Sequence, residues 1–323
     1  MAVTSIPPVT APPAGGPPPT PRFVGRPDAF RRRLARIGWA FTAPSLVLVG
    51  VVTIFPIVFS IVMSLTHVSV TASGFHIGSF TWGNYSLVLK SGTWQYALWF
   101  TVVYTVVTVI AELLIGTCIA LVLERLVRGR GILMALLLIP WSLITVISAE
   151  LWKYIYDPTF GIADRFFQAV GMGQPVILGS NLSAIIAMMV ADVWKTTPFV
   201  AIIVLAGLMM IPQELYEAAD VDGASSWTMF WRVTFPLLRP TIALAVLFRV
   251  LQAFGLFDLP YVLTQGGPGN STTPLAILGY DVMFKNLSFG PGAAIATSTA
   301  MLVVLGCFLF LRVFRAQVGK EEL

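Results

Sequence analysis

The chain has 323 residues, of which 57% are hydrophobic and 11% are charged. Ordinary soluble domains carry about 25% charged residues, so this composition excludes a soluble enzyme and predicts that most of the protein lies inside a lipid bilayer. The formal net charge of +5 does not indicate a nucleic-acid-binding protein, because no basic face interleaved with aromatic residues occurs outside the loops and tails.

The N-terminal segment is expected to form no packed core. Residues 1–21 are rich in proline, alanine and glycine, a composition typical of disorder. A basic flank follows, formed by Arg22, Arg26, Arg31, Arg32, Arg33 and Arg36. The apolar run after it is long enough to cross a membrane, which indicates an uncleaved first span rather than a signal peptide. Residues 1–37 are therefore predicted to be a disordered cytoplasmic tail.

Six apolar runs each approach or exceed the roughly 20 residues that a helix needs to cross the hydrocarbon core. They cover residues 40–65, 96–123, 132–152, 182–211, 237–263 and 293–311. Four prolines inside three of these runs predict local kinks, at Pro44, Pro56, Pro140 and Pro198. The predicted fold is an all-α integral membrane bundle of six transmembrane helices, with a transmembrane domain at residues 38–315 and a cytoplasmic tail at 316–323. In the outer loops, residues 163–170 are expected to form a short interfacial helix.

Lysine and arginine set the expected orientation. With the N-terminus inside, 14 of these residues fall on the cytoplasmic side and 4 in the outer loops, while Lys195 and Arg249 fall within spans. This asymmetry follows the positive-inside rule. Both termini and the segment between the fourth and fifth spans are therefore predicted to be cytoplasmic.

That segment, residues 212–236, contains the densest acidic stretch of the sequence. Pro212 suits the first turn of a helix, and Gly223 suits the left-handed residue that ends one. A second short helix can begin with Ser225 as its N-cap. We call residues 212–236 the elbow, and predict a helix–glycine–helix docking surface in which the apolar side of the first helix is formed by Leu215, Ala218 and Ala219.

The elbow resembles the EAA signature of ABC importer permeases, E-A-A-x3-G-x9-I-x-L-P. The matching residues are Glu217-Ala218-Ala219, Gly223 and Val233-Thr234-Phe235-Pro236, with Val in place of Ile and Phe in place of Leu. In that family the loop is the coupling helix, which inserts into a cleft on the ATP-binding subunit. The resemblance implies docking by Leu215, Tyr216, Glu217, Ala218, Ala219, Asp220, Asp222 and Gly223. The alternative is an ordinary amphipathic helix in a loop between two spans.

The resemblance also implies the partners: a second homologous permease subunit, two ATP-binding cassette subunits, an extracytoplasmic solute-binding lipoprotein and a carbohydrate substrate. The chain contains no G-x-x-x-x-G-K-[ST] sequence, so ATP and magnesium are expected on the partner subunits. This chain is therefore expected to be a non-catalytic subunit without a cofactor, located in the bacterial plasma (inner) membrane.

The loop at residues 264–275 carries a Gly-Gly-Pro stretch that resembles the MalF-like branch of sugar permeases. Its expected contacts with the binding protein are Gly266, Gly267, Pro268 and Asn270. The whole chain resembles the trehalose permeases of mycobacterial importers, which implies a disaccharide such as trehalose as cargo. A simple connecting turn remains the alternative for this loop.

Charged residues inside the spans are costly, at roughly 2.5–3.5 kcal/mol each near the bilayer centre, so they are expected to face protein, water or each other. Asp192 and Lys195 are three residues apart and can form an ion pair on one helix face. Arg249 is expected to contact a carboxylate on another helix or on the partner subunit. Alternatively these groups line a polar sugar path, whose candidate residues are Glu150, Trp152, Asp192, Trp194, Arg249 and Gln252.

Two other functional classes, a secondary transporter and an intramembrane enzyme, agree less well with the sequence. A secondary solute transporter commonly shows duplicated halves with broken spans, and no such pair is visible in the sequence. An intramembrane enzyme needs a nucleophile, a metal or an acid–base pair at one depth. Cys118 and Cys307 are interpreted as small buried side chains, and the pair His67 and His76 as solvated loop residues, so no metal site is expected.

Overall fold

The computed structural model describes residues 28–318 except 72, 73, 127, 172 and 174. These residues are mostly helical, and five helices among them are long and apolar enough to cross a membrane. A sixth crossing results when α5 (Arg130–Ser142) and α6 (Thr145–Ile155) count as one broken span. The predicted helical membrane fold with six spans is confirmed in this sense, while the orientation of the termini stays a prediction.

The chain divides into two compact units, Met1–Ile57 and Val58–Leu323, which are described separately. In the first unit, α1 (Asp28–Val49) continues through a π-helical turn (η1, Gly50–Ile54) toward α2 (Phe55–Ser64). Because α1 begins at Asp28, the prediction that the disordered tail extends to residue 37 is wrong over residues 28–37, and the rest of that tail lies outside the described residues.

The second unit departs from an all-α fold in the segment between α2 and α3 (Gly83–Lys90). β1 (Thr66–Thr71) pairs antiparallel with β2 (Gly74–Phe80), and α3 follows. The β-branched residues of β1 favour an extended backbone. Asn84 of α3 ties the hairpin down, because its side-chain amide donates hydrogen bonds to the carbonyls of Ser64 (3.0 Å) and Thr66 (2.9 Å).

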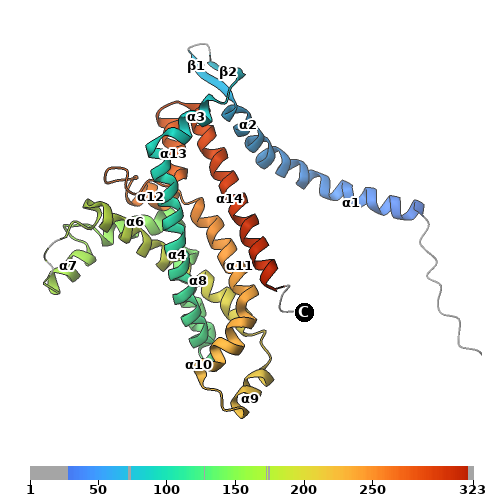
Figure 1. Cartoon of the computed structure of the whole chain (residues 1–323), viewed down its shortest axis with the longest axis vertical. Coiled ribbons are helices and arrows are strands. Elements are labelled where there is room, and N and C mark those ends of the chain that lie inside the picture. The colour runs from blue at the N-terminus through green and yellow to red at the C-terminus, as the bar shows by residue number, and fades with distance from the viewer. Residues whose placement is uncertain (1–27, 72–73, 127, 172, 174, 319–323) are drawn as a thin grey trace, which may run out of the picture. The chain divides into compact units, whose positions relative to one another are not determined.

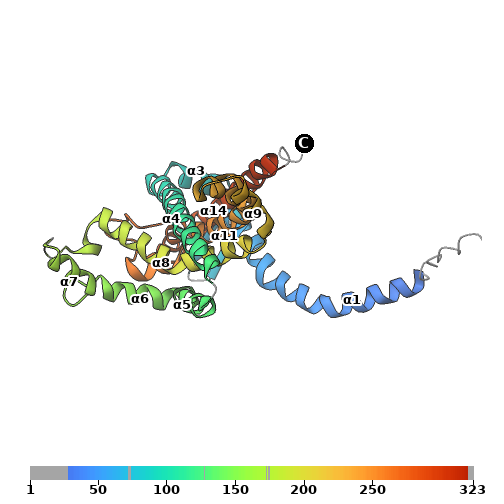
Figure 2. The same cartoon turned by 90° about the horizontal axis from the view of Figure 1, so that it is seen from below.

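Two long helices cross at the centre of this unit, α4 (Gly92–Arg125) and α8 (Asn181–Leu208), and they lie side by side in Figures 1 and 2. Small residues permit the close approach: a Cβ at Gly116 of α4 would lie 3.0 Å from Val200 Cγ1 and 3.1 Å from Ala201 N on α8. The core at this crossing is formed by Ala120, Leu123, Val200, Val204, Leu205, Leu208, Leu238 and Ala245.

The predicted third span at residues 132–152 is broken. α5 and α6 meet at 90°, because Leu143 and Ile144 between them have extended backbone angles. Pro140 has no N–H to donate to the preceding turn, which weakens the end of α5. The kink predicted at Pro140 is therefore a sharp bend just beyond it. The short helix expected at residues 163–170 is present as α7 (Ile162–Ala169), and its interfacial position stays a prediction. A short 3-10 turn (η2, Ile177–Gly179) leads into α8.

In the C-terminal half, the fifth span ends earlier than expected, and the sixth span is longer than expected at both of its ends. α11 (Phe235–Phe254) stops before residue 263, and the remainder of the predicted fifth span forms a separate short helix, α12 (Asp258–Leu263). α13 (Leu275–Tyr280) and a π-helical turn (η4, Asp281–Lys285) precede α14 (Phe289–Val318). Because α14 continues to Val318, residues 316–318 of the predicted tail are helical, and 319–323 lie outside the described residues.

Two further clusters of buried side chains complete the second unit. One joins α4, α6, α8 and α12 around Tyr104 and Met188, and the other joins α3, α4, α13 and α14 around Trp94 and Leu275. Cys118 is exposed and Cys307 is half-buried in this chain. Their interpretation as buried side chains is therefore wrong for the chain by itself, because both lie on the outward-facing sides of long helices.

Candidate functional site: an exposed elbow and a buried polar cluster

The first helix of the elbow is α9 (Gln213–Val221), which begins directly after Pro212. Gly223 adopts φ +71°, the left-handed conformation that glycine tolerates best. Two backbone hydrogen bonds close the helix end, from Gly223 N to Asp220 O and from Ala224 N to Ala219 O, both 3.0 Å. The helix and its glycine stop are therefore confirmed, and α9 lies at the opposite end of this unit from the β hairpin (Figure 1).

Most of the expected docking residues are free of contacts that would bury them. Leu215, which is 42% exposed, shares this exposed surface with Glu217, Ala218, Asp220, Asp222 and Gly223. Tyr216 and Ala219 are half-buried instead, and the Tyr216 hydroxyl lies 3.3 Å from Thr234 Oγ1. The helix thus packs inward through Tyr216, and the apolar side at Leu215 and Ala218 faces outward.

The second part of the elbow differs from the prediction. Ser225 does cap α10 (Ser226–Met229), since its hydroxyl accepts a hydrogen bond from Thr228 N. However, α10 continues through a π-helical turn (η3, Phe230–Thr234) into α11 without a break. Pro236 lies in the first turn of α11, where proline is tolerated. The elbow is therefore one short helix, α9, followed by the first turns of a long continuous helix formed by α10, η3 and α11.

Deep in the spanning part, one arginine joins three helices. Arg249 of α11 donates hydrogen bonds to both carboxylate oxygens of Glu112 on α4, one of them 2.7 Å long. Its Nη2 also lies 3.6 Å from Asp192 Oδ2 on α8. The side chains of Arg249 and Glu112 are 2% and 0% exposed. The expectation that Arg249 meets a carboxylate on another helix is confirmed.

Neutral polar groups complete this buried cluster. The Tyr104 hydroxyl donates to Asp192 Oδ2 (3.2 Å), and the Thr196 hydroxyl donates to Glu112 Oε1 (2.7 Å). Arg249 Nη1 donates to Gln252 Oε1 (2.8 Å). Because the guanidinium holds the amide oxygen of Gln252, which is an exposed residue, the amide N–H groups of Gln252 remain free to donate elsewhere.

The other predicted path residues are not part of this cluster. Glu150 is exposed on α6 and lies 3.8 Å from Lys153. Trp152 and Trp194 contact each other edge to face, with ring centroids 5.6 Å apart. Among the described residues, Lys195 makes no ion pair within 4.0 Å, so the predicted Asp192–Lys195 pair is wrong. Asp192 points to Arg249 and Tyr104 instead.

An aromatic surface that was not predicted from the sequence lies beside this cluster. Trp141 of α5 stacks on Phe199 of α8, with centroids 5.7 Å apart and planes at 13°, and Phe199 contacts Phe248 of α11 edge to face at 6.2 Å. Phe248 and Gln252 are four residues apart and so share one face of α11. Trp141 and Phe248 are both exposed in this chain. The four-residue spacing of Phe248 and Gln252 could have predicted that they share a helix face. Nothing in the sequence predicted that α5 would bring Trp141 close to them.

The loop at residues 264–275 is folded tightly against α4. Thr272 donates to Gly267 O (2.7 Å), and the Tyr96 hydroxyl donates to Ser271 O (2.9 Å). Gly266 is buried, Gly267 and Pro268 are half-buried, and Asn270 is exposed. Of the four predicted contacts with a binding protein, Asn270 is thus the one with an exposed side chain.

Lys285 and Asp281 form an ion pair with a distance of 2.7 Å, and the neighbouring Asp281 carboxylate raises the pKa of the Lys285 ammonium. Within the part of the chain that the structure describes, no group of three or more histidine, cysteine, aspartate or glutamate side chains could hold a metal ion.

Comparisons with known proteins agree with this architecture. Residues 22–320 match the family model of the binding-protein-dependent transport system inner membrane component. The chain is 38% identical to the trehalose/maltose transport system permease protein MalF of Thermococcus litoralis, over 88% of this chain and 96% of that protein. It is 35% identical to the trehalose transport system permease protein SugA of Mycobacterium tuberculosis, over 89% of this chain and 91% of that protein.

The fold is also that of a solved transporter. A subunit of a bacterial alginate ABC transporter, crystallised in complex with an alginate pentasaccharide-bound periplasmic protein, matches with a TM-score of 0.75 and 19% identity, over 88% of this chain and 94% of that subunit. The family match excludes the secondary transporter and the intramembrane enzyme. The chain is a multi-pass membrane protein and belongs to the binding-protein-dependent transport system inner membrane components, the non-catalytic permease subunits of ABC importers, whose ATPase activity resides on separate subunits.

Proposed function

We propose that this chain forms half of the translocation path of a disaccharide importer that accepts trehalose, maltose or a close analogue. The proposal rests mainly on one arrangement of side chains. The exposed Gln252, held by Arg249, lies on the same helix face as Phe248, which belongs to the aromatic surface formed with Trp141 and Phe199. Sugar rings offer hydroxyls to amide donors and apolar C–H faces to aromatic rings. The names of the two relatives, both trehalose permeases, support the choice of cargo.

A second, homologous permease subunit is proposed to complete the path. Gln252 is exposed in this chain, beside the exposed side chains of Trp141 and Phe248, although polar groups at membrane depth normally face protein or a water-filled cavity. A partner placed against this face would enclose the sugar between two subunits. A solute-binding protein that delivers the sugar from outside is proposed to contact Asn270.

Coupling to ATP hydrolysis is proposed to occur through the elbow. α9 offers an exposed surface with an apolar residue, Leu215, beside the carboxylates Glu217 and Asp220. The elbow runs without interruption into α11, which carries Arg249 and Gln252. A rigid helix of this length can transmit a movement of the elbow to the path. ATP and magnesium are proposed to bind to the two ATPase subunits.

The proposal is tested by reconstituting the four-subunit complex with its binding protein in proteoliposomes. ATP hydrolysis and uptake of radiolabelled sugar are measured with trehalose, with maltose and with a monosaccharide as control. Stimulation of both activities by trehalose or maltose, and not by the monosaccharide, is expected. Stimulation by a non-carbohydrate solute alone would overturn the proposed cargo. Gln252→Leu, which keeps side-chain size but removes the amide, is expected to lower uptake about tenfold while the complex still assembles.

A further inference from the structure

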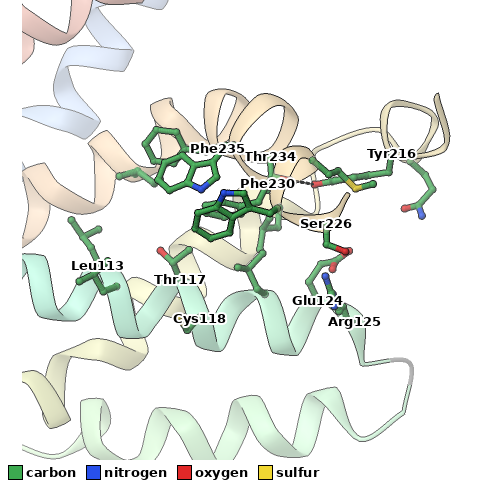
Figure 3. A pocket seen from close by; sticks show the side chains of 18 residues that line it. Leu113, Thr117, Cys118, Glu124, Arg125, Tyr216, Ser226, Phe230, Thr234 and Phe235 are labelled. Atoms are coloured by element: carbon green, nitrogen blue, oxygen red, sulfur yellow. Dashed lines mark hydrogen bonds between the residues drawn. The ribbon is translucent and has the colours of Figure 1, made fainter. Parts of the chain in front are cut away.

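A cavity of about 890 Å³ lies between the second half of α4 and the elbow. Figure 3 shows α4 on one side and the α10–α11 segment on the other, with side chains of both directed into the space between them. Its walls are mainly apolar and include Leu113, Leu114, Leu121, Phe230, Phe235 and Ile242. No residue of the proposed sugar path lines it, so it is a separate site.

The cavity has one charged end. Glu124 and Arg125 lie beside Ser226 at that end, and Leu113 lies at the other (Figure 3). Both charged residues are exposed, and neither forms an ion pair within 4.0 Å with another described residue. The opening therefore presents one negative and one positive side chain next to each other, above an apolar interior.

The length of the cavity corresponds to one leaflet of a bilayer. From Leu113 to Arg125, α4 advances about 18 Å at 1.5 Å per residue. Half of the hydrocarbon core measures about 15 Å. An acyl chain that enters beside Arg125 and runs along α4 to Leu113 would therefore stay within a single leaflet.

The cavity is also open to the side. Leu114 is 64% exposed, Trp227 is 71% exposed, and Cys118 of α4, which also lines the cavity, is exposed as well. Tryptophan is enriched where membrane and water meet, because its ring is apolar and its N–H is polar. Trp227 follows Ser226, which lies at the charged end, and its residue type is the one expected near the level of lipid head groups.

We propose that this cavity binds one phospholipid whose head group carries both a phosphate and a primary ammonium, as phosphatidylethanolamine does. Arg125 binds the phosphate, Glu124 accepts a hydrogen bond from the ammonium, and an acyl chain fills the apolar interior. A purely anionic head group would meet Arg125 but would be repelled by Glu124. A quaternary ammonium, as in phosphatidylcholine, has no N–H to donate to Glu124.

Such a lipid would contact the elbow and α4 at once. Tyr216 and Thr234, which hold α9 against the start of α11 at 3.3 Å, both line the cavity. A bound acyl chain would fill the space behind this contact and stabilise the position of α9. The proposal rests on the predicted orientation only in placing the lipid in the cytoplasmic leaflet, and it is independent of the transported sugar.

The test counts lipids that remain bound to the purified permease complex. The complex is exchanged into nanodiscs that contain equal amounts of phosphatidylethanolamine, phosphatidylcholine and phosphatidylglycerol, re-extracted in mild detergent, and analysed by mass spectrometry. Wild-type protein is expected to retain phosphatidylethanolamine above the other two. Glu124→Gln and Arg125→Gln are each expected to reduce this retention about two- to fivefold, the range for a charge pair that water can reach. Arg128→Gln is the matched control, because Arg128 is exposed near the same helix end but does not line the cavity.

Three outcomes would overturn the proposal. Equal retention in all variants would mean that the head group does not bind at Glu124 and Arg125. A preference for phosphatidylglycerol that is lost only in Arg125→Gln would indicate an anionic lipid instead. Thr117→Trp, which fills the cavity, is expected to expel the lipid and leave the complex assembled. If Thr117→Trp instead prevents assembly while the charge variants have no effect, a segment of another subunit occupies the cavity. Lipid retention without sugar uptake would overturn the proposed function and leave this site intact.

Discussion

Arg249 on α11 and Glu112 on α4 meet as a two-point ion pair in the spanning part of the protein, although they are 137 residues apart in the sequence. Two parallel hydrogen bonds fix both the distance and the relative rotation of the two helices. Asp192 approaches the same guanidinium from α8 at 3.6 Å. The contact thus sets the arrangement of the three helices that surround the central core.

The first prediction concerns the unequal roles of these charges. Arg249→Met leaves two buried carboxylates without a cation and is expected to destabilise the complex by about 3–5 kcal/mol. Glu112→Gln keeps Arg249 beside Asp192 and is expected to cost about 1.5–3 kcal/mol. Thermal unfolding of the purified complex compares the two variants. Equal losses, or a larger loss for Glu112→Gln, would contradict this reading of the cluster.

A second prediction follows from the position of Lys195. Since Lys195 makes no ion pair with Asp192, Lys195→Met is expected to assemble normally and to change stability by no more than about 0.5 kcal/mol. Asp192→Asn leaves Arg249 paired with Glu112 and is expected to assemble as well. The yield of monodisperse complex measures both. If a double variant that combines Asp192→Asn with Lys195→Met assembled much better than Asp192→Asn alone, the Asp192–Lys195 pair would have to form in the assembled transporter.

Sequence periodicity and charge were sufficient for the spans and the helix stop at Gly223, because a bilayer requires long apolar runs and a left-handed residue favours glycine. They were insufficient to predict the partner of Asp192. Its neighbour three residues along the chain was the obvious partner, yet the rotation of α8 directs it toward Arg249 on α11. Contacts between residues this far apart depend on how helices pack, and the separate sequences of the helices do not specify that.

The same limit explains the 90° bend between α5 and α6 and the missed surface of Trp141, Phe199 and Phe248. A proline at position 140 predicts a weak point, but not the angle at which the chain leaves it. The angle places Trp141 against Phe199, so this stacking contact could not be read from composition. The exposed end of α9 was predictable because it depends on local residues alone.

A third prediction uses a close approach between α8 and α11, at Gly207 and Thr241. A Cβ at Gly207 would lie 2.6 Å from Thr241 Oγ1 and 2.9 Å from Thr241 Cβ, so the two helices would have to separate. Gly207→Ala is expected to destabilise the complex by about 1–3 kcal/mol. Gly306→Ala in α14 has no atom within 4 Å of the new methyl group and serves as the control. Equal thermal stability of the two variants would show that α8 and α11 adjust at no cost.

The orientation gives a fourth prediction. An enzyme reporter that is active only in the cytoplasm is expected to be active when fused after Arg128 or Gly223. Fused after Gly78, Gly171 or Gly269, it is expected to be inactive, because the positive-inside rule puts these positions outside. An active fusion at Gly171 would contradict the assignment of α5 and α6 as a single broken span.

The fifth prediction separates the docking role of the elbow from backbone strain as such. Gly223 has φ +71° and Gly171, in the loop between α7 and α8, has φ +78°, and no atom lies within 4 Å of a Cβ at either position. Valine at either site therefore brings the same kind of strain, at least about 1–2 kcal/mol, without a steric clash. Gly223→Val is expected to abolish sugar uptake, because α9 would meet the ATPase subunit at a different angle. Gly171→Val is expected to leave uptake near that of the wild type. Co-purification of the ATPase subunits with each variant is measured beside uptake; normal uptake and normal co-purification in Gly223→Val would exclude coupling through this helix.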